Sequence, residues 1–167
     1  MKKLSEIGNG IQITEKGSHL DEPRTAIIEA NNIVSCQLSF GGHFFIEKLD
    51  YETLVHGFLS LDKTGFSCEE ENILDGFGYY VLIKKGSFYS PVYIFWNIND
   101  TCHYLSNLIL SKIKIILTPL SGKDEKGSID LFSSEEKNNL LSLEKIQKID
   151  KDQGWSQIVR QWKNKET

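Results

Sequence analysis

The hydrophobic positions of the chain are densest between residues 76 and 98, where two apolar segments flank a short polar turn. Residues 78–84 and 90–97 are rich in β-branched and aromatic side chains, which favour strands. Gly86 between them allows the positive φ angle of a short hairpin loop. Because both faces of each segment are apolar, the pattern is typical of strands that are covered on both sides. We therefore expect a β-hairpin inside a sheet, with helices or another layer on each face.

Alternation of apolar and polar residues predicts further strands before this hairpin. Residues 10–15 form a short strand pattern in an otherwise polar segment, which we expect at an edge of the sheet or mobile. Residues 25–29 and 33–40 are predicted strands, separated by the turn-forming pair Asn31-Asn32. Gly41-Gly42 then turns the chain into a strand over residues 43–49, which completes a second hairpin.

A different period, of three to four residues, predicts helices. Asp50 is a suitable N-cap for a helix over residues 51–61, whose apolar stripe contains Gly57, a residue that weakens a helix by about 1 kcal/mol relative to alanine. A second helix is predicted over residues 101–111. Residues 112–118 alternate and are predicted as another strand, a possible crossover partner of the hairpin.

The C-terminal third of the chain predicts two more helices. Ser133 and Glu136 have the spacing of a capping box before a helix over residues 134–148. Trp155 and Trp162 lie on one stripe of a short terminal helix, which we expect to dock on the domain.

These elements predict a single α+β domain over residues 1–167, with a mixed or mainly antiparallel central sheet flanked by three to four helices. Residues 1–22 are expected to be mobile or at an edge. Residues 150–167 are expected to form the docked terminal helix and a polar tail.

Composition and charge narrow the classes of partner. The net charge of −4 argues against a nucleic-acid-binding surface and is compatible with a basic protein partner. Two lysines near the N-terminus are not followed by an apolar stretch, so we expect no signal peptide. No run approaches the roughly 18 apolar residues of a membrane helix. Three cysteines without CxxC spacing indicate reduced thiols and a cytoplasmic location.

The chain lacks the familiar linear signatures of catalysis. It has no GxGxxG, GxxxxGK[ST], HExxH or GxSxG motif, so we expect no cofactor, no metal site and no enzymatic activity. An alternative remains in an enzyme with a dispersed site near His43, Cys102 or His103. Cys102 stands near a predicted helix N-terminus, a position that lowers a thiol pKa.

An acidic run between the first helix and the central hairpin is the strongest candidate for a binding site. It consists of Glu69, Glu70 and Glu71, with Asp75 in the same connection. It is either a solvated loop or a negative face that steers a basic partner. In the second interpretation, Tyr79 and Tyr80 are candidates for specific contacts, because they follow the same connection and aromatic side chains are enriched at interfaces.

In its small size, acidity, leaderless start, lack of a catalytic motif and α+β pattern, the chain is similar, as a class, to immunity proteins of bacterial contact-dependent and polymorphic toxin systems. No motif of an individual immunity family is present, so no family residues are carried over. The resemblance implies a cytoplasmic protein that neutralises a cognate toxin domain, with no role for nucleic acid or membrane as partners. A small-ligand-binding or scaffold domain with an apolar pocket remains the other alternative.

Overall fold

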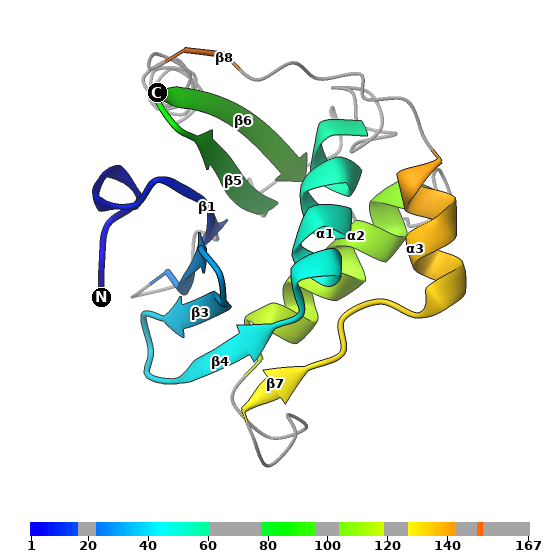
Figure 1. Cartoon of the computed structure of the whole chain (residues 1–167), viewed down its shortest axis with the longest axis horizontal. Coiled ribbons are helices and arrows are strands. Elements are labelled where there is room, and N and C mark those ends of the chain that lie inside the picture. The colour runs from blue at the N-terminus through cyan, green and yellow to red at the C-terminus, as the bar shows by residue number, and fades with distance from the viewer. Residues whose placement is uncertain (17–22, 61–77, 96–103, 119–126, 143–149, 152–167) are drawn as a thin grey trace.

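A computed structural model describes residues 1–16, 23–60, 78–95, 104–118, 127–142 and 150–151 (Figure 1). Within these residues, three α-helices pack on a sheet that has the strand order β7-β4-β3-β2-β1-β5-β6-β8. Neighbouring strands are antiparallel, except that β4 and β7 run parallel. The elements are η1 (Leu4–Glu6), β1 (Asn9–Lys16), β2 (Thr25–Ala30), β3 (Val34–Leu38), β4 (His43–Ile46), α1 (Lys48–Ser60), β5 (Gly78–Lys85), β6 (Phe88–Phe95), α2 (Tyr104–Ile116), β7 (Ser128–Ile129), α3 (Ser134–Leu141) and β8 (Asp150–Lys151). The predicted α+β class with a mixed, mainly antiparallel sheet is confirmed.

The hairpin of β5 and β6 lies inside the sheet, as its two apolar faces predict. β5 is hydrogen-bonded to β1 on one side and to β6 on the other, and its residues from Gly78 to Lys84 are all buried. Gly86 opens the connecting turn with a φ of +62°, a conformation that glycine adopts at little cost. β6 pairs with β5 along its length and with β8 at Phe88 and Tyr89.

The expected edge or mobile position of the N-terminal strand is wrong. β1 lies in the middle of the sheet, with five residue pairs to β2 and eight to β5. Its inward side chains Ile11 and Ile13 are fully buried. Burial of these two isoleucines outweighs the polar composition around them, because each buried aliphatic side chain contributes about 1.5–3 kcal/mol.

The second predicted hairpin is confirmed as the β2–β3–β4 meander. Val34, Cys36 and Leu38 of β3 point into the core and alternate with more exposed residues. β4 ends at Ile46, earlier than predicted, because α1 begins at Lys48.

The first predicted helix is confirmed, with a shifted start. α1 spans Lys48–Ser60, so Asp50 lies in its first turn and is not the N-cap. Leu54 and Phe58 of the predicted stripe are fully buried. Gly57 faces α2, where a Cβ atom built on it would lie 2.6 Å from Cδ1 of Ile109. The two helices therefore approach each other at a position that accommodates no side chain.

The strand predicted over residues 112–118 is wrong, because α2 continues through Ile116. Ile109, Ile113, Ile116 and Leu117 are all buried, and their spacing of four, three and one residues follows a helix face. The alternation of lysine and isoleucine from Lys112 to Ile115 imitates a strand, but Ile115 is 44% exposed.

The capping box before α3 is confirmed in both directions. The Ser133 hydroxyl accepts a hydrogen bond from the Glu136 amide, and the Glu136 carboxylate accepts one from the Ser133 amide. α3 spans Ser134–Leu141, and the remainder of the predicted helix lies outside the described residues. The terminal tryptophan helix also lies outside them, so its docking stays a prediction. The short strands β7 and β8 were not predicted.

The two faces of the sheet are covered differently. The three helices lie on one face and form the main core with the inward side chains of the strands (Figure 1). On the other face, the N-terminal residues Leu4 and Ile7 form a small cluster with Ile27 and Leu82. The expectation of a layer on each face is thus met by helices on one side and by a short N-terminal segment on the other. None of the helices in the described residues is long and apolar enough to cross a membrane.

Candidate functional site

Acidic side chains gather where β4 leads into α1. Glu47 links the two elements, and its carbonyl oxygen accepts the hydrogen bond of the Tyr51 amide at 3.0 Å. Asp50 follows in the first turn of α1, where the helix dipole favours a negative charge. The Glu47 side chain is 63% exposed, whereas that of Asp50 is fully buried.

A second junction, where β7 leads into α3, lies against the first. Asp130 directly follows β7, and the amide of the next residue, Leu131, donates a hydrogen bond of 2.9 Å to Oδ2 of Asp50. Lys137 of α3 places its ammonium 3.0 Å from Oδ1 of Asp50 and 3.9 Å from Oε2 of Glu47. Asp50 therefore ties the start of α1 to the segment before α3.

Glu47, Asp50 and Asp130 form an acidic cluster in which one carboxylate oxygen from each residue lies within 4.8 Å of the others. The contact with Asp50 raises the pKa of Lys137 above its usual 10.5; burial opposes this increase, and the charges of Asp50, Glu47 and Asp130 add to it. Three carboxylates and one ammonium give this group a formal charge of −3 + 1 = −2 at neutral pH. Glu47 and Asp130 are both exposed and present the excess charge to solvent.

Three carboxylates at this spacing have the oxygen donors that a hard divalent cation prefers. In this protein the ammonium of Lys137 already contacts two of them, Asp50 and Glu47. The cluster is therefore an acidic surface with an internal counter-ion, and we do not assign it as a metal centre.

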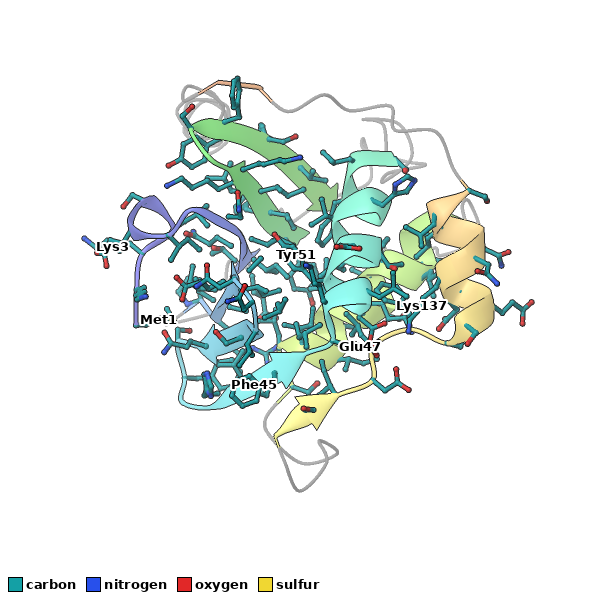
Figure 2. All side chains as sticks on the ribbon, viewed as in Figure 1. Met1, Lys3, Phe45, Glu47, Tyr51 and Lys137 are labelled. Carbon is teal, nitrogen blue, oxygen red and sulfur yellow. The ribbon has the colours of Figure 1, made fainter. Side chains whose placement is uncertain are left out.

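Two exposed apolar side chains flank Glu47 along the chain; Phe45, Glu47 and Lys137 are labelled in Figure 2. Phe45 precedes Glu47 by two residues and is 36% exposed, and Leu49 follows it by two and is 42% exposed. The Phe45 ring packs edge-to-face on His43, with 4.9 Å between the ring centroids. Negative charge beside accessible apolar groups is a combination found in protein-binding surfaces.

The structure describes only two of the residues that the sequence proposes as one binding site. Glu69, Glu70, Glu71 and Asp75 lie outside the described residues. Tyr79 and Tyr80 lie in β5 and are only 1% and 3% exposed. Burial raises the pKa of Tyr79 to about 12; the charge of Glu15 adds to the increase and Arg24 opposes it. In the described structure, these two tyrosines belong to the packed sheet and offer almost no surface to a partner.

Of the three alternative catalytic residues, the structure describes only His43. His43 is exposed on β4, and Cys102 and His103 lie outside the described residues. Cys36 is buried in β3. The described residues therefore bring no nucleophile and base together from the set that the sequence suggested.

No protein-family model, curated protein or solved structure matches this chain. Function is therefore inferred from the charge, burial and geometry of the described residues. Asp130 and Lys137, on which the acidic cluster depends, carried no signal in the sequence, because each is an ordinary charged residue until β7 and α3 are placed beside α1.

Proposed function

We propose that this protein is a non-enzymatic, cytoplasmic binding protein that neutralises a basic protein partner, a cognate toxin domain of a bacterial toxin–immunity system. The observation that supports the proposal is the acidic cluster, with two exposed carboxylates in a group of formal charge −2. The whole chain carries a net charge of −4 in the same sense. A toxin domain that acts on nucleic acid needs a basic surface, so an acidic protein can cover it through charge complementarity.

In this proposal Glu47 and Asp130 steer the partner, while Phe45 and Leu49 supply apolar contact area once the surfaces meet. The acidic residues Glu69–Glu71 and Asp75 are proposed as a further part of the negative surface. Long-range attraction mainly raises the association rate, and salt reduces this gain as the Debye length shortens to about 8 Å at physiological ionic strength.

The first experiment tests the function. The partner is identified by affinity capture in the source bacterium and purified, and its toxic activity is measured with increasing amounts of the protein. We expect stoichiometric inhibition of the partner's activity, and growth protection when both are co-expressed. A captured partner that is neither basic nor toxic, or whose activity is unchanged in the complex, would contradict the proposed function.

The second experiment tests the surface, using Glu47→Gln against the matched control Glu6→Gln. Both glutamates are exposed and both substitutions change the net charge by one unit, but Glu6 lies in η1, away from the acidic cluster. One charge about 10 Å from a partner charge in water contributes about 0.4 kcal/mol, or about a factor of two in rate. We expect Glu47→Gln to lower the association rate by about this factor at low salt, with no such effect from the control. If the two variants have equal association rates and both still inhibit the partner, the acidic cluster is not part of the interface, and the proposed function is unaffected.

A further inference from the structure

A buried lysine holds the N-terminal residues against the face of the sheet opposite the helices. Lys84 of β5 is only 9% exposed, and its ammonium donates hydrogen bonds to the carbonyl oxygens of Leu4 at 3.4 Å and Ser5 at 3.2 Å. It also lies 5.5 Å from the centroid of the Tyr89 ring. Among the residues that the structure describes, no carboxylate forms an ion pair with Lys84. Within that part of the chain, the buried ammonium is satisfied by neutral groups alone, a costly arrangement compared with its hydration in water.

The segment that Lys84 holds, residues 1–8, is here called the N-terminal strap; in Figure 1 it is the blue segment before β1. Leu4 and Ile7 are its buried side chains, and they contact a cluster that is separate from the main core. Its other polar contacts with the described part of the chain are few. The Gly8 carbonyl accepts a hydrogen bond from the Gly86 amide at 2.9 Å, and Lys2 forms an exposed ion pair with Glu29 at 3.3 Å.

The junction between the strap and β1 is built from glycines. The strap packs directly against Gly10. A Cβ atom at this position would lie 2.5 Å from Cδ1 of Ile7 and 2.2 Å from the Ile28 carbonyl oxygen, so no larger residue fits here. Gly8 has no heavy atom within 4 Å of the corresponding position, so there is open space around it once its hydrogen bond with the Gly86 amide is broken. A glycine in open space, followed by a continuous central strand, provides a hinge at the end of a rigid element.

We infer that the N-terminal strap opens as a unit, with Gly8 as its hinge, while the sheet stays folded. Segments that bury few apolar side chains and make few hydrogen bonds open with smaller free energies than the global fold. Opening hydrates the Lys84 ammonium and uncovers Ile27 and Leu82 beside it. The strap therefore covers a latent surface that combines one positive charge with apolar side chains, on the face opposite the helices.

Chemical labelling of Lys84 measures this opening, and the neighbouring Lys85 provides an internal control because it is exposed. The protein is acetylated briefly with an amine-reactive reagent, and the modification at each lysine is localised by tandem mass spectrometry. We expect Lys84 to react at least about tenfold more slowly than Lys85. Its rate should rise only weakly with urea below the unfolding transition, because opening the strap exposes little surface.

The variant Ile7→Ala should raise the labelling rate of Lys84 about tenfold and leave that of Lys85 unchanged, since it removes most of a buried side chain from the strap. Ile33→Ala is the matched control, because Ile33 is 66% exposed and does not belong to the cluster that Leu4 and Ile7 form. The inference is overturned if Lys84 labelling has the same steep urea dependence as global unfolding followed by circular dichroism. It is also overturned if Lys84 reacts as fast as Lys85 in the unaltered protein, or if Ile7→Ala and Ile33→Ala have the same effect.

Discussion

Gly57 provides a direct test of how α1 and α2 pack. In an isolated helix, replacing a central glycine with alanine stabilises the helix by about 1 kcal/mol. In this protein the new Cβ atom would lie 2.6 Å from Cδ1 of Ile109, too close for two carbon atoms. Ile109 is fully buried, so its side chain cannot swing into solvent to relieve the overlap.

The gain in helix propensity and the steric cost of the overlap have opposite signs and comparable size. Overpacking a well-filled core costs about 1–3 kcal/mol, so Gly57→Ala should destabilise the protein by about 1 kcal/mol net of the helix gain. Ile109→Val removes the Cδ1 atom that clashes. The next nearest atoms to the new Cβ are Cγ1 of Ile109 at 3.6 Å and Cδ2 of Leu140 at 3.8 Å, both ordinary contact distances. In the Ile109→Val background, the same glycine substitution should therefore stabilise the protein by about 1 kcal/mol.

The measurement is a double-mutant cycle of urea unfolding on the four proteins, followed by circular dichroism. We expect a coupling energy of about 2 kcal/mol. For a chain of this length, about 1 kcal/mol shifts the melting temperature by roughly 2–4 °C, so the reversal of sign is measurable by calorimetry as well. If Gly57→Ala stabilises both backgrounds equally, α1 and α2 do not meet at this glycine and the packing described here is wrong.

Two further predictions concern pH. Burial raises the pKa of both Tyr51 and Tyr79 to about 12, and the charge of Glu15 adds to the increase at Tyr79. In the unfolded chain these tyrosines ionise near pH 10. The stability that they contribute is therefore present below pH 10 and should fall between pH 10 and 12. Ultraviolet titration should show late ionisation of both residues, with one late-ionising group lost in each of Tyr51→Phe and Tyr79→Phe. Ionisation of either residue near pH 10 in the folded protein would contradict this burial. The pKa of Lys137 is raised above 10.5 first by its contact with Asp50; its stabilising contribution is therefore complete below pH 10.5 and lost at higher pH. Lys137→Met should lower stability at pH 7 and flatten this alkaline loss in urea titrations, and an unchanged alkaline slope would show that the contact is not made.

The parts of the fold that were predicted correctly are those that local patterns determine. The β5–β6 hairpin follows from two-faced apolar segments around Gly86, and the start of α3 follows from the capping box of Ser133 and Glu136. In both cases, the residues that specify the element are close together in sequence. Turn and capping chemistry needs no knowledge of distant neighbours.

The errors arose where two periods fit the same residues. From Lys112 to Ile115 lysine and isoleucine alternate, which favours a strand, yet the segment continues the helical stripe of Ile109 and Ile113. Extending the preceding helix by five residues, to Ile116, buries Ile113 and Ile116 and brings the next residue, Leu117, into the same core. A separate strand would have exposed part of this set, so burial over the longer window decides between the periods.

The position of β1 could not be predicted because it depends on partners distant in sequence. Ile11 and Ile13 are two isolated apolar residues until β5 and β2 provide their neighbours. Pro91 was a usable signal about the order of the strands. A proline lacks the amide donor that a fully paired strand needs, and it lies in β6, which pairs with β8 at only two residues. β1, which contains no proline, takes the more central position in the sheet.

The candidate site illustrates the same dependence on long-range contacts. Asp50 has the sequence properties of a helix N-cap, an ordinary use of aspartate. In the structure its carboxylate contacts the Leu131 amide and the Lys137 ammonium, both more than 80 residues away. Asp50 is therefore occupied in joining two elements, which leaves Glu47 and Asp130 as the exposed charges of the cluster. This division explains why a dense acidic run is not the only way to build a negative surface. Three carboxylates from two separate junctions, with one lysine between them, give a local charge of −2 from residues that no short window of the sequence brings together.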